Sequence, residues 1–274
     1  MAKMGIVWDR TAAFVGERLG TLLPVALVAF VVPGVVSSCA QVLAAGATSG
    51  ARLGLGALVL LLSLPSIWGS LTVIALATGE ERLPNAGGLA MRRLPATVLV
   101  SVGLGLAAVL ALLPVAVILA ASGYDVAAIA AGQAGNVVVD PRASGLVALY
   151  MLVLVPLLLV AFTRLLLVTP VVLREGVLFG AIRRSWALTR KHGWRIFGML
   201  LLFGLTGGIA QLAAQAVFGS VFTLLAGGGQ GLTTAFVLTT LATSCVQAIV
   251  MVLLAAFQGR LYVALTTADS VWRA

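Results

Sequence analysis

Residues that could perform acid–base or metal chemistry are few in this sequence and widely separated. There is one histidine, His192, and the carboxylate nearest to it along the chain is Glu175. Without a close acidic partner, His192 is interpreted as an interfacial side chain rather than a general base. The two cysteines, Cys39 and Cys245, lie in different apolar runs, without the spacing of a metal or redox site. We therefore expect no enzyme, and no catalytic, metal-binding or cofactor-binding residues.

Residues for coupled transport are also scarce. Proton- and cation-coupled carriers usually place carboxylates within the bilayer, but none of the eight carboxylates falls well inside an apolar run. This disfavours a proton-coupled pump, while a passive or sodium-coupled path through backbone carbonyls stays open. Gln211, Gln215 and Gln247 are candidates to line such a path, and hydrogen bonding between helices is the alternative.

The strongest functional pattern is the basic segment between Arg174 and Arg195. Wound as a helix, it separates into two faces. One arc carries Leu178, Ala181, Ile182, Ser185, Trp186, Leu188 and Thr189. The opposite arc carries Arg183, Arg184, Arg190 and Lys191, with Ala187 among them. A basic face, an apolar face and a tryptophan predict a helix lying in the headgroup layer of a membrane. An ordinary loop with a solvated charge run is the alternative.

These basic residues are the candidate site. Each Lys or Arg near an anionic leaflet contributes about 1 kcal/mol to membrane binding. We expect contact between anionic lipid headgroups and Arg174, Arg183, Arg184, Arg190 and Lys191. Arg164 is the one charge inside a predicted span, near its inner end. It either extends toward the headgroups or contacts an anionic lipid or a substrate phosphate beside Arg174.

Six apolar runs must position these residues. The chain of 274 residues is 61% hydrophobic and only 9% charged, whereas soluble domains carry about a quarter charged residues. A transmembrane helix needs about 20 apolar residues, and a single membrane domain, 1–274, is predicted. The predicted spans are 19–45, 53–77, 96–121, 145–172, 196–226 and 232–258. The predicted fold class is thus an all-α integral membrane protein with six transmembrane helices.

The basic residues also predict the orientation. Of the 17 Lys and Arg residues, three lie in the N-terminal segment and three in the connection between spans two and three. The connection between spans four and five holds six, and the C-terminal tail holds two. The other side has Arg52 and Arg142. Because cytoplasmic loops are enriched in Lys and Arg, both termini are expected in the cytoplasm. The net charge of +9 is explained by this topology, and no nucleic acid partner is expected.

Amphipathic cytoplasmic helices are predicted before the first, third and fifth spans, at residues 4–18, 84–94 and 177–192. In the first, Met4, Val7, Trp8, Thr11, Phe14 and Val15 share one face, and Asp9, Arg10, Ala13 and Glu17 the other. Ala90-Met91-Arg92-Arg93 echoes Ala181-Ile182-Arg183-Arg184. The pattern fits three repeated units of a surface helix plus a helical hairpin, or independent convergence on charged inner loops.

One stretch resembles a known family. Residues 169–176 read T-P-V-V-L-R-E-G, residues 181–189 read A-I-R-R-S-W-A-L-T, and Trp194-Arg195 follow. This resembles the membrane domain attached to some bacterial glycerophosphoryl diester phosphodiesterases, and related standalone multi-span proteins. Leu261-Tyr262 also resembles the family's Leu-Tyr end, although Val263-Ala264-Leu265 replaces its usual continuation.

The resemblance implies a membrane module of a bacterial inner membrane. The fused proteins carry a soluble phosphodiesterase barrel, for which this sequence has no room and no metal-binding His/Glu cluster, so no catalytic residue is carried over. We expect a non-enzymatic inner-membrane protein, a lipid-engaging scaffold or accessory module, with membrane lipids as partners. A small transporter or lipid-translocating permease is the alternative.

Overall fold

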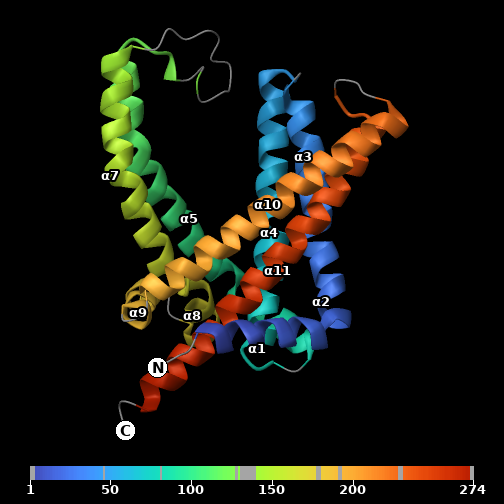
Figure 1. Cartoon of the computed structure of the whole chain (residues 1–274), viewed down its shortest axis with the longest axis vertical. Coiled ribbons are helices and arrows are strands. Elements are labelled where there is room, and N and C mark those ends of the chain that lie inside the picture. Colours follow the sequence, from blue (N-terminus) through green and yellow to red (C-terminus); the bar gives the residue numbers. More distant parts are fainter. Residues whose placement is uncertain are drawn as a thin grey trace.

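The computed structural model describes residues 4–45, 47–80, 82–126, 129, 140–176, 180–190, 193–227 and 231–271. Within these ranges every long regular element is a helix (Figure 1). Six stretches are long and apolar enough to cross a membrane. They are 19–44, 50–77, 83–121, 141–175, 193–226 and 234–267. The predicted fold class is therefore confirmed.

The elements follow one another as helices and short connections. They are α1 (Met4–Glu17), α2 (Leu19–Ala26), the π-helical turn η1 (Leu27–Val31), α3 (Val32–Ala45), α4 (Ser49–Ala77), α5 (Leu83–Ala121), α7 (Pro141–Leu165), α8 (Val168–Glu175), α9 (Gly180–Thr189), α10 (Gly193–Ala226) and α11 (Thr234–Val271).

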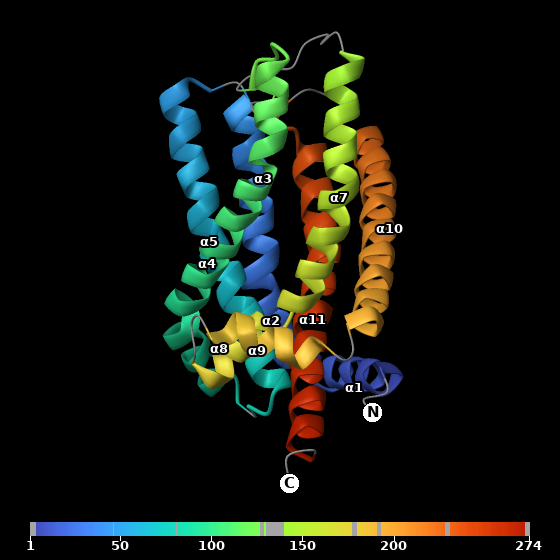
Figure 2. The same ribbon diagram turned by 90° about the vertical axis from the view of Figure 1, so that its left-hand side faces the viewer.

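The short helices α1, α8 and α9 lie across one end of the bundle, where α7 ends and α10 begins (Figures 1 and 2). We call this the basal end. Both clusters of buried apolar residues involve these helices: Phe14 and Leu173 belong to one, and Val7, Val171 and Ala181 to the other. The basal end is therefore the best-packed part of the molecule.

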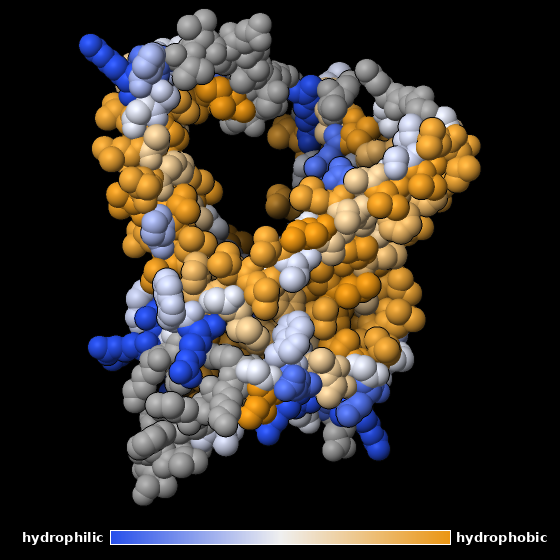
Figure 3. Space-filling view, in the orientation of Figure 1, coloured by the Kyte–Doolittle hydropathy of each residue, from blue (hydrophilic) through white to orange (hydrophobic). Residues whose placement is uncertain are grey.

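The opposite part of the bundle is much more open. The most apolar window of the α5 span has 0% of its residues buried and that of the α7 span 6%, against 28% for the first two spans. Figure 3 shows a wide opening between the α5–α7 pair and the α3–α4 pair, with apolar surface around it. Such surface belongs in lipid, because a bilayer carries no penalty for exposing it.

The sequence predicts most of the buried face of α1. Val7, Thr11 and Phe14 are buried, and Asp9 and Glu17 are exposed, but Trp8, predicted to share the face of Val7, is 39% exposed. The Thr11 hydroxyl donates to the Val7 carbonyl one turn earlier, which satisfies a polar group that would otherwise be buried unpaired. The amphipathic pattern therefore seats α1 against the bundle.

The segment 84–94 is not a separate surface helix. It forms the first turns of α5, which continues through Pro95 to Ala121. Apart from Pro95, the chain offers no turn residue between Arg93 and Ala96. The fixed φ of proline is compatible with a helix once the lost hydrogen bond is tolerated. The Trp68 indole N–H donates to the Gly87 carbonyl at 3.2 Å and holds this part of α5 against α4.

The fourth predicted span divides into two helices. α7 ends at Leu165 and α8 begins at Val168. Pro170 has no N–H to donate to the Leu166 carbonyl, so a continuous helix loses a backbone bond at this point. Arg164 therefore lies in the last turn of α7, at the basal end (Figure 2).

A proline also marks the irregular turn in the first span. Pro33 cannot donate to the carbonyl of Ala29, four residues before it, and the Ser66 hydroxyl of α4 donates to that carbonyl at 2.8 Å. Gly69 allows this close approach, because a methyl group there would lie 2.2 Å from the Ala29 Cβ. The π-helical turn is thus stabilised by its neighbour.

Candidate functional site

α8 and α9 are held against the basal end by their apolar faces. In α8, Val168, Val171, Val172 and Leu173 are buried. In α9 the buried residues are Ala181, Ser185, Leu188 and Thr189. The Ser185 hydroxyl donates to the carbonyl of Arg164 and so joins α9 to the end of α7. The predicted apolar arc of α9 therefore contacts protein along most of its length.

Arg174 is bound within the protein. Its guanidinium donates to the Thr78 hydroxyl at 2.7 Å, to the Glu80 carboxylate at 3.1 Å and to the Ala75 carbonyl at 3.2 Å. Ala75 and Thr78 lie at the C-terminal end of α4, where the helix dipole favours a positive charge. Arg174 thus fastens α8 to α4.

Glu175 makes the second internal link. Its carboxylate accepts a hydrogen bond from the Tyr262 hydroxyl at 3.1 Å and lies 3.4 Å from Arg184 Nε. These contacts join α8 to α11 and to α9. The next residue, Gly176, ends α8 in a left-handed conformation with φ of 69°, and its Cα faces the guanidinium of Arg93.

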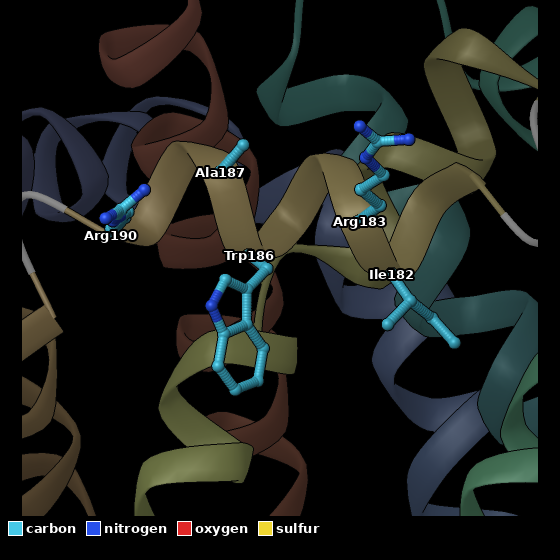
Figure 4. A pocket seen from close by; sticks show the side chains of 5 residues that line it. All are labelled: Ile182, Arg183, Trp186, Ala187 and Arg190. Atoms are coloured by element: carbon cyan, nitrogen blue, oxygen red, sulfur yellow. The ribbon is translucent and has the colours of Figure 1, made fainter.

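Two other arginines, Arg183 on α9 and Arg190 directly after it, face outward. Arg183 and Arg190, with Ile182, Trp186 and Ala187, line an open hollow of about 590 Å³. Figure 4 shows Trp186 and Ile182 on one side of α9, Arg183 and Ala187 on the opposite side, and Arg190 near its end. Among the described residues, no carboxylate lies within salt-bridge distance of Arg183 or Arg190. Trp186 is 46% exposed.

Arg164 lies beside this hollow. Its guanidinium carbon is 5.6 Å from the centre of the Trp186 ring, within cation–π range. A methyl group at Gly193 would lie 3.2 Å from the same carbon, so glycine leaves room for the guanidinium. One buried nitrogen, Nη1, has no hydrogen-bond partner among the described residues. Arg164, Trp186, Arg183 and Arg190 thus form one basic and aromatic surface, which we call the α9 surface.

The structure divides the candidate residues predicted from the sequence. Arg164, Arg183 and Arg190 come together around Trp186, whereas Arg174 and Arg184 are engaged by carboxylates of the same chain. Lys191, His192 and Leu178 lie outside the described residues. The partners Thr78, Glu80 and Tyr262 were missed, because each is more than 80 residues away from the arginine or glutamate that it contacts.

The three glutamines do not line one pocket. Gln247 lines a pocket of about 430 Å³ together with Ser37, Ser63, Ser66 and Ser70, and no residue of α10 lines it. Gln211 and Gln215 lie on α10, and Gln211 Oε1 is buried without a partner among the described residues. Within the same ranges, no group of three His, Cys, Asp or Glu residues is placed to hold a metal ion.

The all-helical fold and its six long apolar helices define a multi-pass, all-α membrane protein. Within that class, residues 10–265 match a family described as a domain of unknown function, DUF7847, and the chain belongs to this family. No curated relative and no solved structure matches it. The α9 surface is therefore the feature of the molecule that bears most directly on its function.

Proposed function

We propose that this protein is a non-enzymatic, lipid-engaging scaffold or accessory module of a bacterial inner membrane, with its basal end toward the cytoplasm. One observation carries the proposal: Arg183 and Arg190 flank the exposed Trp186 in an open hollow, without a carboxylate partner among the described residues. Arginine and tryptophan at the end of a membrane bundle suit the headgroup layer. The ligand is an anionic phospholipid of the inner leaflet.

The internal contacts sharpen this proposal. Arg174 and Arg184 already have anionic partners, so the lipid contact is assigned to Arg164, Arg183 and Arg190. Each Lys or Arg near an anionic surface contributes about 1 kcal/mol. Removing two of these charges is therefore expected to weaken lipid binding by about 2 kcal/mol, which is roughly 30-fold. We also propose, from the resemblance within residues 169–195, that the protein is related to the membrane domains of glycerophosphoryl diester phosphodiesterases.

The test is native mass spectrometry of the protein released from nanodiscs that contain phosphatidylglycerol. The double variant Arg183→Gln, Arg190→Gln is compared with the wild type and with Arg142→Gln. Arg142 is exposed at the start of α7, at the opposite end from α9, and so controls for the loss of charge alone. We expect the double variant to lose bound lipid and Arg142→Gln to keep it. Equal retention in all three proteins would contradict the proposal.

The pocket around Gln247 favours the alternative function, a small transporter or lipid-translocating permease. Its four serines and one glutamine are polar groups at mid-span, next to the π-helical turn and Pro33. A cysteine in place of Ser37, in a background without Cys39 and Cys245, tests this function. Labelling by a membrane-impermeant thiol reagent from both sides of the membrane would favour transport, and labelling from one side or neither would oppose it.

A further inference from the structure

The pocket around Gln247 lies within the membrane-spanning part of the bundle and is built from three helices. Its polar lining comes from Ser37 of α3, from Ser63, Ser66 and Ser70 of α4, and from Gln247 of α11. Ser63 is the middle residue of α4, so the pocket lies at mid-span. Its volume of about 430 Å³ falls within the range of small-molecule sites, about 300–1,000 Å³.

Three of the serines present hydrogen-bond acceptors to the pocket. The Ser63 hydroxyl donates to the carbonyl of Leu60 at 2.6 Å, and the Ser70 hydroxyl donates to the carbonyl of Ser66 at 2.9 Å. The Ser66 hydroxyl donates to the Ala29 carbonyl at the π-helical turn. A hydroxyl group has one proton and two lone pairs, so these three oxygens can accept a further hydrogen bond but cannot donate one.

Gln247 adds donors to the same pocket. Its side chain is half-buried, and its amide group makes no hydrogen bond to any residue that the structure describes. An amide carries two N–H donors and a carbonyl acceptor, and an unsatisfied polar group in the hydrocarbon region of a membrane costs free energy. A bound group that accepts a hydrogen bond from this amide would remove that cost.

The charge of the lining restricts the ligand further. Among the described residues, neither an acidic nor a basic side chain lines the pocket. A bound anion or cation would lack a counter-charge there, and an unpaired charge at the centre of a bilayer is costly. A neutral hydroxyl group fits the lining, because it donates to a serine oxygen and accepts from the Gln247 amide.

The rest of the lining is apolar and continues into surface that faces lipid. It includes Phe30, Val59, Leu62, Ile67 and Met251. Leu60 and Leu61, between two of these residues, are 72% and 63% exposed. Leucine side chains exposed to this extent at mid-span belong in hydrocarbon. The mouth of the pocket is therefore next to lipid, where an alkyl chain can continue out of it.

We propose that this pocket is a binding site for a neutral lipid alcohol, whose free hydroxyl lies among Ser63, Ser66, Ser70 and Gln247 while its hydrocarbon chain extends into the bilayer. Phe30 of η1 lines the site, and π-helical turns are frequent at functional sites. The lipid is a diacylglycerol or a single-chain alcohol, which share this chemistry. The pocket shares no residue with the α9 surface, and the proposal concerns binding rather than passage across the membrane.

The test is photolabelling of the full chain in phosphatidylcholine nanodiscs. The probes are a diacylglycerol and hexadecanol, each with a diazirine near the hydroxyl end of an alkyl chain. The deoxy analogue of each probe, with hydrogen in place of the hydroxyl group, is its control. Mass spectrometry locates the label and measures its yield as the mole fraction of the probe is raised. We expect saturable labelling beside the pocket by at least one alcohol, and about fivefold weaker labelling by its deoxy analogue, which lacks the hydrogen bonds.

Two variants remove polar groups of the pocket. Gln247→Leu and Ser63→Ala should each weaken labelling by the alcohol about fivefold and leave labelling by the deoxy analogue unchanged. Ser63→Ala serves alone if Gln247→Leu does not fold. Ser220→Ala is the matched control and should have no effect. Ser220 is exposed on α10, donates to its own helix at the Ala216 carbonyl, and does not line the pocket.

The outcomes separate the ligand and the two sites. Stronger labelling by one of the two alcohols identifies the kind of lipid. Labelling should be the same in the Arg183→Gln, Arg190→Gln variant as in the wild type, so the result does not depend on whether the α9 surface binds lipid. The proposal is overturned if both alcohols label no more than their deoxy analogues, if no label lies beside the pocket, or if both pocket variants label like the wild type.

Discussion

Adjacent arginines of α9 face different surroundings. Arg184 lies 3.4 Å from the Glu175 carboxylate, which also accepts a hydrogen bond from Tyr262. Arg183, its neighbour in the sequence, faces an open hollow beside Trp186. A step of one residue turns a side chain by about 100° around a helix, and this turn separates an internal link from an exposed charge. A count of basic residues gives the two arginines the same role, whereas the fold does not.

The difference predicts two kinds of variant. Substituting an arginine that faces the protein lowers stability and leaves lipid binding unchanged. Substituting an arginine that faces outward weakens lipid binding and leaves stability unchanged. The predictions below challenge this division, beginning with the substitution that is expected to have the largest effect.

Arg174→Gln should destabilise the protein most. It removes the ion pair with Glu80 and the bonds to Thr78 and Ala75. Hydrogen bonds to a charged group are worth about 1.5–3 kcal/mol each when fully protected, and the partial exposure here reduces the total to about 1–3 kcal/mol. Denaturation in detergent measures the loss. Wild-type stability combined with a loss of bound phosphatidylglycerol would instead place Arg174 among the arginines that contact lipid.

Gly176→Ala should follow, at about 1–2 kcal/mol. The left-handed conformation at Gly176 disfavours any side chain, and the new methyl group would lie 2.7 Å from the Arg93 guanidinium. Gly88→Ala is the control, because Gly88 is helical and a methyl group there meets no atom within 4 Å. The control should be neutral or stabilising. Equal effects of the two substitutions would argue against this account of the α8 terminus.

Arg184→Gln should have the smallest effect, at or below about 1 kcal/mol, since both partners of the pair are about a third exposed. Arg183→Gln, one residue earlier, provides the matched comparison and should leave stability unchanged. A double-mutant cycle with Glu175→Gln separates the pair from each residue's own contribution. Coupling between Arg183 and Glu175 of the same size as that of Arg184 would remove the distinction.

The sequence predicts features that depend on local periodicity. The six spans follow from long apolar runs, and the buried face of α1 follows from residues three and four positions apart. The continuity of α5 through Pro95 and the break before α8 were missed. Both depend on which backbone hydrogen bonds the surrounding structure can replace, and an apolar run does not encode that.

The site is predicted only in part for a related reason. Residue type and spacing place Arg183 and Arg190 on a basic face, and the structure keeps both outward. The pairing of Arg174 with Glu80 joins residues 94 positions apart, so no local pattern reveals it. The contacts of Arg18 and Arg260 with the ring of Phe14 likewise require α1 to lie across α11. Long-range packing, rather than composition, decides which charges are paired.

The length of the last hairpin has a mechanical consequence. α10 has 34 residues and α11 has 38, which correspond to about 51 and 57 Å at 1.5 Å per residue. The hydrocarbon core of a bilayer is about 30 Å thick, and Figure 1 shows both helices running obliquely relative to α7. A tilted helix adapts to a thinner or thicker bilayer by changing its inclination, at fractions of a kcal/mol per Å. A change in bilayer thickness is therefore expected to alter the inclination of the α10–α11 hairpin, whose helix α10 begins at the basal end (Figure 1).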